Sequence, residues 1–550
     1  MAQVLYNRGI QTLADIEHFF YDKDIATDPF AFKDMRRAID RITRAIKASE
    51  KIAVYGDFDA DGVTATTLMM QVLKALKAHA YAYIPHRVDE GYGLNVEALE
   101  KLAAEGVTLV ITVDCGIRSI EEVQAGNEAG LDIIVTDHHS IGHEIPPAYA
   151  IVNPQQADCA GDSTLAGVGV AFMVARALLL DGWRRNGSGD KRPYERLVDQ
   201  LLDLVAIGTV ADIMPLNSPL NRRLVRRGLE VIRRAERPGI KALIDVSGLR
   251  TEQITATSIG FVLGPRINAA GRLDHAMTAY ELLSSSSYKQ ALEYAEQLQT
   301  LNQKRQNLTR EAHVRIQAMI EAEQQLFGNL IFAADKAASP GIVGLVAGRL
   351  TESYYRPAII LDQGPEESHA SCRSIPEFHI TQALDGCADL LVRHGGHAQA
   401  AGFTVLNQNI DMLKQRLQQK ADEILTGLEL IPVLDIDVEL SPRDLNEELV
   451  QELGILEPTG HKNEMPIFVS RRLRVHEHRT VGTDNQHLKL IVAVDGANPI
   501  DCIGFRLGMW ADNMPEQIDI VYHLEINEWQ GRRNLQLNLK DLRPSGEDTL

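Results

Sequence analysis

Short apolar runs alternate with amphipathic stretches through the first 220 residues, and this alternation constrains the fold more than any other feature of the chain. The runs with the length of buried strands are Lys51–Tyr55, Ala80–Ile84, Thr108–Val113, Asp132–Thr136 and Ala150–Val152. The stretches with helical periodicity between them are Thr64–Lys77, Val96–Glu105 and Ser119–Ala129. Strands separated by helices of this length are typical of crossover units. The sequence therefore predicts a parallel sheet with helices on both faces.

The rest of the chain predicts a multidomain α/β protein. Gly167 to about Phe327 is mainly helical, with a loop at Asp181–Pro193. A second α/β segment follows, with strands at Leu330–Ala334, Ala358–Leu361 and Gly402–Val405 and a helix at Gly344–Tyr354. Beyond Pro432, alternating strands predict a small β-barrel: Asp435–Glu439, Leu473–His478, His487–Val494, Ile518–Ile526 and Asn534–Leu539.

These changes of texture divide the chain into four predicted domains. They are a parallel-sheet domain at 1–220, a helical connector at 221–328, a second α/β domain at 329–427 and an OB-like β-barrel at 428–550. A chain of 550 residues is too long for one compact core, so several domains are expected.

The composition is that of an ordinary globular protein, with 45% hydrophobic and 24% charged residues. The amino-terminal segment lacks the cationic start and apolar core of a signal peptide, and the apolar runs are short of a bilayer span. Five cysteines are scattered without paired spacing, which favours a reducing compartment over disulfides or a zinc site. We therefore expect a cytoplasmic protein.

The formal net charge of −19 weighs weakly against a polyanionic substrate, because Lys and Arg supply most sequence-independent affinity for phosphates. The average conceals a basic stretch, however. Between Asn221 and Lys241 there are eight Lys or Arg residues against Glu230 and Glu236 only. This stretch predicts either a solvated basic helix face or one that contacts phosphates.

Three carboxylates, Asp57, Asp59 and Asp61, stand at alternate positions between a predicted strand and a helix. In an extended turn they point the same way, and their mutual repulsion is costly unless a cation neutralises it. Alternating acids also occur in solvated turns and helix caps. A calcium loop would need an acid at its twelfth position, where Leu68 stands, so that interpretation is discarded.

Two further strands end in possible metal ligands, Asp114 after Thr108–Val113 and His138 after Asp132–Thr136. Ligand sites of open α/β sheets lie outside the carboxyl ends of the strands, so these ends converge on one crevice. Asp212 lies in an apolar segment, where an unpaired carboxylate is costly unless it caps a helix or meets a cation. Carboxylates with imidazole and no thiolate favour manganese or magnesium over zinc.

Four segments, in this order, resemble the successive motifs of the DHH phosphoesterase superfamily: residues 56–62, 113–116, 136–139 and 208–212. Further segments resemble the RecJ family of single-stranded-DNA exonucleases: residues 85–87, 90–94, 165–172, 264–272, 372–374, 395–397 and 539–544. The resemblance covers nearly the whole chain. It identifies the second α/β domain as DHH-associated and the barrel as an oligonucleotide-binding domain.

The resemblance implies a 5′-to-3′ exonuclease that hydrolyses single-stranded DNA to mononucleotides in DNA repair and recombination, with two manganese or magnesium ions. The implied metal ligands are Asp57, Asp59 and Asp114 for one ion, and Asp61, Asp114, His138 and Asp212 for the other. Asp114 would bridge the ions. His139 would face the scissile phosphate as a charge stabiliser or acid.

The resemblance also implies substrate contacts, from Arg87, Arg266, Arg272, Ser371, Arg373 and His397. Phosphoryl chemistry needs positive charge opposite the metals, and Arg373 and His397 would supply it from the second α/β domain. Alternatively, Arg373 pairs with a local acid and His397 is a turn residue. The partners that the family implies are single-stranded DNA, a single-strand-binding protein and a helicase.

Three positions depart from the family pattern, Ser339 in place of a histidine, Thr459 in place of Phe and Lys462 in place of Gly. None belongs to the implied ligand set. Two rival functions remain to be weighed. A DHH phosphodiesterase of short oligonucleotides, cyclic dinucleotides or pyrophosphate would share the metal motifs and usually the DHH-associated domain. The C-terminal barrel and the RecJ-like segments argue against it. A scaffold without activity would have lost ligands that are all present here.

Overall fold

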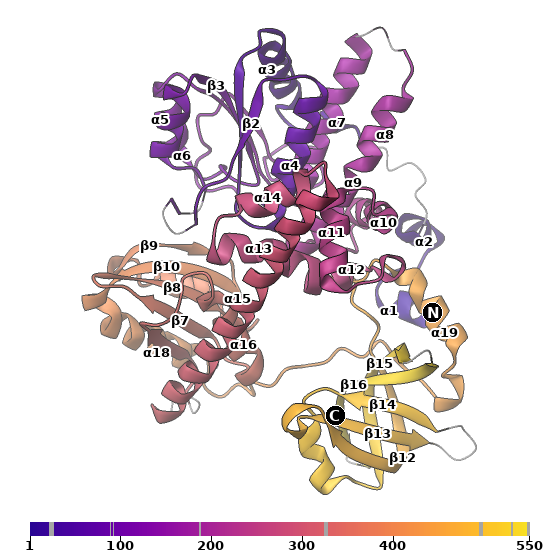
Figure 1. Ribbon diagram of the computed structural model, residues 1–550. Helices are drawn as coiled ribbons and strands as arrows, with labels where there is room; N and C mark the ends of the chain where they lie inside the picture. The colour runs from indigo at the N-terminus through magenta and orange to yellow at the C-terminus, as the bar shows by residue number, and fades with distance from the viewer. Residues whose placement is uncertain are drawn as a thin grey trace.

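The computed structural model describes residues 1–20, 27–87, 90–91, 93–185, 187, 189–323, 328–493, 499–529 and 532–546. Tyr92 and Val494, which belong to a quoted motif and a predicted strand, lie outside these ranges. Figure 1 shows a first α/β domain joined to a helical section, a second α/β domain beside the long helix α15, and a barrel that carries the C-terminus. The predicted fold class is confirmed. The exact domain boundaries stay predictions.

The first domain is built on a five-stranded sheet in the order β2-β1-β3-β4-β5. Its strands are β1 (Lys51–Gly56), β2 (Ala80–Tyr83), β3 (Val107–Val113), β4 (Asp132–Thr136) and β5 (Ala150–Val152). All neighbours pair in parallel, as the alternation of strands and helices predicts.

Both faces of this sheet are covered. On β1, Ile52 and Val54 belong to one core cluster, and Ala53 and Tyr55 belong to another, because successive side chains of a strand point to opposite faces. The first cluster includes α3 (Met35–Lys47), α4 (Ala60–Ala75) and α7 (Gly167–Arg185). The second includes α5 (Val96–Ala104) and α6 (Ile120–Glu128). The carboxyl ends of the strands are thereby held at one edge.

The helical section continues from α7 to the 35-residue helix α15 (Tyr288–Ala322). Between them come α8 (Arg192–Gln200), α9 (Leu202–Ala211), α10 (Pro219–Arg234), α11 (Pro238–Ser247), α12 (Ala256–Ser258), a π-helix (Ile259–Leu263), α13 (Gly264–Leu273) and α14 (Met277–Ser284).

The predicted loop at Asp181–Pro193 is wrong at both ends, because α7 runs to Arg185 and α8 begins at Arg192. The ion pair between Asp181 and Arg185, one helical turn apart at 2.5 Å, supports the additional turn of α7.

The basic stretch from Asn221 to Lys241 forms α10 and the start of α11, and its arginines bind other parts of the chain. Arg222 is only 2% exposed, and its guanidinium donates to the carbonyls of residues 455–458 at 2.8–3.2 Å. Arg227 and Arg234 pair with Asp199. These contacts support neither a solvated face nor a phosphate-binding one. The stretch stabilises the fold.

The second α/β domain has a mixed sheet in the order β6-β7-β8-β10-β9. Its elements are β6 (Ile331–Asp335), α16 (Val343–Tyr354), β7 (Ala358–Gln363), β8 (Glu367–Arg373), α17 (Ile380–Asp385), β9 (Leu391–Gly396), β10 (Ala400–Leu406) and α18 (Ile410–Leu425). The sequence did not predict β8 and β9, which are polar.

The C-terminal domain is a six-stranded sheet, closed by the additional pairing of β12 with β15. The strands are β11 (Val438–Glu439), β12 (Phe468–Val481), β13 (His487–Ala493), β14 (Ile500–Gly504), β15 (Gln517–Trp529) and β16 (Arg532–Pro544), and α19 (Glu447–Leu453) precedes β12. The amino-terminal helices α1 (Ala2–Asn7) and α2 (Leu13–Phe20) contribute side chains to the barrel core. Among the described helices, none is long and apolar enough to cross a membrane.

Candidate metal centre

The turn from β1 into α4 carries the first three carboxylates. Asp59 is the N-cap of α4, and its Oδ1 accepts the amide N–H groups of Asp61 and Gly62 at 2.9 and 3.0 Å. A Cβ on Gly62 would lie 2.5 Å from the carbonyl oxygen of Asp57, so only glycine permits this turn. The sequence folds here into a cap that holds Asp57 and Asp61 beside it.

Asp61 is buried at the amino terminus of a second helix. Its carboxylate oxygens accept the amide N–H groups of Gly167 and Val168, the first residues of α7, at 2.7 and 2.9 Å. A helix amino terminus stabilises negative charge. Burial and the neighbouring charge of Asp59 nevertheless raise the pKa of Asp61 to about 7. The carboxylate is therefore held in place, and a cation beside it would favour its ionised form.

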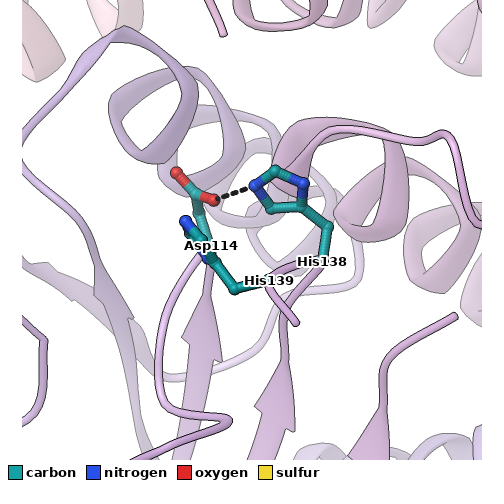
Figure 2. A group of neighbouring side chains, drawn as sticks. All are labelled: Asp114, His138 and His139. Carbon is teal, nitrogen blue, oxygen red and sulfur yellow. Dashed lines mark ion pairs between the residues drawn. The ribbon is translucent and has the colours of Figure 1, made fainter. Parts of the chain in front are cut away.

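The ends of β3 and β4 bring Asp114 and His138 together (Figure 2). Asp114 Oδ1 lies 3.2 Å from His138 Nε2, which lies 3.4 Å from Asp212 Oδ2. The first approach lacks hydrogen-bond geometry, and both atoms are buried without a hydrogen-bond partner, as is Asp57 Oδ1. Burial and the charge of His139 lower the pKa of His138 to about 4. His138 is therefore neutral at pH 7, which is the form that binds metals.

The six predicted ligands form one cluster at the edge of the sheet. Their ligand atoms lie within 4.8 Å of one another in three groups: Asp57 with Asp59 and Asp114, Asp61 with His138 and Asp212, and Asp114 with His138 and His139. Burial and neighbouring acids raise the pKa of Asp57, Asp114 and Asp212 well above the usual range. Buried, mutually repelling carboxylates with unpartnered atoms fit divalent cations.

Asp137 is a site residue that the sequence did not single out, although it stands in the motif at 136–139. It is 1% exposed and accepts the amide N–H groups of Ile117, His138 and His139 at 3.0, 2.7 and 3.1 Å. Its Oδ1 also lies 2.7 Å from His139 Nδ1. Burial opposes ionisation of Asp137, but the contact with His139 lowers its pKa overall. Asp137 orients His139 and raises the pKa of that imidazole, against the effect of burial.

Cationic side chains from both α/β domains lie around the acids. Arg87 lies over the ring of Phe58, 4.7 Å from the ring centre, and interacts electrostatically with Asp57 and Asp59. Arg272 donates to the carbonyl of Gly341 at 3.0 Å. Burial and the charge of Arg87 lower the pKa of Arg272 to about 10.

The second α/β domain contributes Ser371, Arg373 and His397. Arg373 donates to the carbonyl of Cys372 at 2.8 Å and approaches Ser371 Oγ at 3.4 Å. Within the described residues it forms no ion pair, so the alternative of a local acid partner is not supported. Burial, and then the charges of Arg118 and His139, lower the pKa of His397, which places it on the side of His139.

Arg266 is the one predicted substrate contact that the structure turns away from the acids. Its Nε donates to Gln299 Oε1 at 2.8 Å, and its Nη1 donates to the carbonyl of Val262 at 2.7 Å. The side chain therefore faces α15 rather than the metal cluster.

Three family profiles match successive parts of the chain. The DHH family N-terminal domain matches residues 51–209, the DHHA1 domain matches residues 327–425, and the RecJ OB domain matches residues 436–541. Together they span the first sheet, the second sheet and the barrel.

Several relatives match the chain over most of its length. The single-stranded-DNA-specific exonuclease RecJ of Bacillus subtilis is 39% identical over 547 residues, covering 98% of this chain and 67% of that protein. The Escherichia coli protein of that name is 36% identical over 528 residues, covering 93% of this chain and 90% of that protein. The crystal structure of RecJ from Thermus thermophilus in complex with Mn²⁺ matches with a TM-score of 0.82 and 29% identity, covering 98% of this chain and 75% of that one. This chain belongs to the RecJ family of single-stranded-DNA-specific exonucleases.

Proposed function

We propose that the protein is a two-metal exonuclease that hydrolyses single-stranded DNA from the 5′ end to mononucleotides, in DNA repair and recombination. The observation that carries this proposal is the cluster of buried acids at the strand ends, with Asp114 common to two groups of ligand atoms. The names of the full-length relatives support the substrate.

Asp57, Asp59 and Asp114 would hold one ion, and Asp61, Asp114, His138 and Asp212 the other. Manganese or magnesium fits this set of carboxylates and one neutral imidazole. RecJ structures from Thermus thermophilus with Mn²⁺ and with Mg²⁺ support this choice. Two ions in such a site, when bound, activate water and neutralise the charge that develops on the phosphate.

The surrounding residues would bind and orient the phosphate. His139, fixed by Asp137, would donate a hydrogen bond or a proton to it, and its raised pKa keeps the imidazole protonated to a higher pH than a free one. Arg87, Arg272 and Arg373 would add positive charge opposite the acids.

Ser371 and His397 would contact the terminal nucleotide from the second α/β domain. Ser371 Oγ lies beside Gly344 of α16, where any larger residue would crowd it, since a Cβ there would be 2.8 Å away. Arg266 would contact the strand only further from the metals, because its guanidinium faces α15. The barrel would hold the part of the strand that has not yet been cut, by stacking on its bases and by charge.

Digestion of one single strand, labelled separately at its 5′ and 3′ ends, tests the proposal. With manganese present we expect early release of the 5′ label as mononucleotide, while the matching duplex is spared. Early release of the 3′ label would contradict the polarity. Faster hydrolysis of a dinucleotide than of the long strand would favour the rival phosphodiesterase.

A single-strand-binding protein and a helicase would be the protein partners of such an enzyme. An exonuclease restricted to single strands acts on a duplex only after another protein has separated its strands.

A further inference from the structure

Helix α15 has a polar centre within a face that is otherwise apolar. The face follows the spacing of three and four residues that keeps side chains on one side of a helix. Its positions are Ala291, Ala295, Leu298, Asn302, Arg305, Thr309, Ala312, Ile316 and Ile320. The amino-terminal members belong to the core of the first domain, and the carboxyl-terminal members pack with α16 and the second sheet. The three central positions are polar.

Three polar atoms in and beside this centre have no hydrogen-bond partner among the described residues. Asn302 is 2% exposed, and its Oδ1 lacks a hydrogen-bond partner. Arg305 Nε and His313 Nδ1 are likewise buried without one. Buried polar groups are nearly always paired, so three such atoms along about three turns of one helix indicate a ligand.

The same region concentrates positive charge. Burial lowers the pKa of Arg305, and the nearby charges of Arg349 and Arg266 lower it further. Burial lowers the pKa of His313 as well, followed by the charges of Arg349 and of Arg506 in the barrel. Among the described residues, Arg266, Arg305 and Arg349 form no ion pair with a carboxylate. In a chain with a net charge of −19, cations without acid partners indicate an anionic ligand.

These cations form a succession that begins at the positive charges around the metal centre. The charges of Arg87, Arg305 and Arg373 lower the pKa of Arg272, in addition to the larger effect of burial. Arg305 is followed by Arg349 and His313, and His313 is followed by Arg506. Helix α15, which runs from the helical section alongside the second α/β domain (Figure 1), therefore carries part of this set of positive charges.

We propose that Arg305 and His313 of α15, with Arg349 of α16, form a second phosphate-binding site. It holds backbone phosphates of the single strand beyond the nucleotide that is being cut. The guanidinium groups donate to phosphate oxygens, and the amide of Asn302, rotated about its last bond, presents its NH₂ group beside them. The inference rests on the proposed exonuclease function and adds the residues that make a long strand a better substrate than a short one.

Two variants test the site, Arg305→Gln and Arg349→Glu. Arg349 is exposed, so its replacement leaves the core intact even if Arg305→Gln fails to fold. With manganese, we expect KM for a long single strand to rise roughly tenfold for each variant, because a charged hydrogen bond is lost. The rise for a dinucleotide is expected to be several times smaller. The slope of log KM against log salt should decrease by about 0.7 for each phosphate contact removed.

Arg310→Gln is the matched control, since Arg310 is exposed on the same helix and donates only to Asn307, at 3.1 Å. It should not change the preference for the long strand. An equal loss on the long strand and the dinucleotide, or an unchanged KM and salt slope in Arg349→Glu, would overturn the site. Failure of the unmodified protein to digest the long strand would instead refute the exonuclease function itself.

Discussion

Asp114 occupies a left-handed backbone conformation, with φ of 64°, at the point where two groups of ligand atoms meet. Residues other than glycine rarely adopt this conformation, and they do so mainly where surrounding structure enforces it. The amide of Asp114 donates to the carbonyl of Thr136 at 3.0 Å, which ties it to the end of β4. The carboxylate is thus positioned at an energetic cost that this hydrogen bond and a bound cation would offset.

Replacing Asp114 by Asn should therefore separate activity from stability. We expect turnover to fall more than about 100-fold, because even residues that only support metal ligands are worth about 10–100-fold. The metal-free variant should be more stable than the unmodified protein, since one buried negative charge is removed from among like charges. Thermal melts with and without manganese measure this, and an undiminished rate would exclude the shared-ligand role.

The pKa of Asp61 predicts the pH dependence of the metal-free protein. The pKa of about 7 in the folded state lies above the ordinary value of an aspartate, so the folded state binds this proton more tightly than the unfolded state. The contribution of Asp61 to the free energy of unfolding is therefore present in full below about pH 4 and decreases as the pH rises to 7. Urea unfolding of chelator-treated protein between pH 4 and 8 measures this.

The variant Asp61→Asn is the control for that pH series, because it has no proton to lose. It should show a shallower decline of stability with pH than the unmodified protein. Identical slopes for the two proteins would show that Asp61 does not titrate as its surroundings indicate.

The metal ligands at strand ends were predictable from the sequence, whereas the residues that bind backbone groups of distant segments were not. The position of Asp57, Asp114 and His138 after apolar runs was enough to expect them at one edge of the sheet. Asp137 and Arg222 bind amide and carbonyl groups of segments that only the folded chain brings near them. No spacing in the sequence encodes such partners.

Among the secondary-structure elements, α7 and α9 contact the buried acids, and each does so through a glycine. A Cβ on Gly167, the first residue of α7, would lie 2.4 Å from Asp114 Oδ1. A Cβ on Gly208 of α9 would lie 2.6 Å from Asp61 Oδ1. Glycine at these positions lets both helices approach the carboxylates closely.

Replacing Gly167 by Ala should weaken metal binding by displacing Asp114. We expect at least about a tenfold loss of manganese affinity, by analogy with changes that disturb the support of metal ligands. Calorimetric titration with manganese measures it. Gly182→Ala on the same helix is the matched control, because its Cβ would meet no atom closer than 4.0 Å. It should raise stability by up to about 1 kcal/mol and leave metal affinity unchanged.

Strands and helices of the first domain followed from periodicity, because its sheet is buried on both faces and its strands are continuous apolar runs. The periodicity did not reveal β8, β9 or β14, which are short and partly polar. Nor did it reveal that α15 is a single helix of 35 residues, since the polar positions near Asn302 and Arg305 interrupt its apolar pattern. Those positions belong to the proposed second phosphate-binding site.

At the scale of the molecule, Arg222 joins the helical section to the segment before the barrel. Its guanidinium fills the turn at residues 455–458 and also donates to the carbonyl of Phe19 at 3.0 Å. A buried guanidinium with several carbonyl partners leaves all of them unsatisfied when it is removed. Arg222 therefore helps to hold the barrel in place, together with the side chains of α1 and α2.

Replacing Arg222 by Ala should destabilise the protein by about 3 kcal/mol or more, given that each unsatisfied buried group costs about 1–3 kcal/mol. Proteolysis between the second α/β domain and the barrel should accelerate. Arg234→Ala, which removes a half-exposed ion pair with Asp199 from the same helix, should cost less than about 1 kcal/mol. Equal denaturant midpoints for the two variants would contradict the role of Arg222.

The fold class was predictable from the sequence, but the arrangement of the domains was not. The formal net charge of −19 weighed against a polyanionic substrate, and this was misleading. It sums acids, among them the cluster at Asp57–Asp61, with the cations that lie between the domains. The arginines most concentrated in the sequence, near Arg222, serve the fold. Those near Arg305, which are dispersed in the sequence, lie together only after folding.

Helix α15 acts as a strut between the two α/β domains, since its ends belong to different cores. At 1.5 Å per residue its 35 residues extend about 52 Å. Moving the two domains apart to open the site from the side would require this helix to break. A strand would then reach the metals by threading in from a free end, and an internal stretch of a closed circle would have no way in. The preference for ends would thus be a mechanical property of the scaffold, independent of any residue that recognises an end.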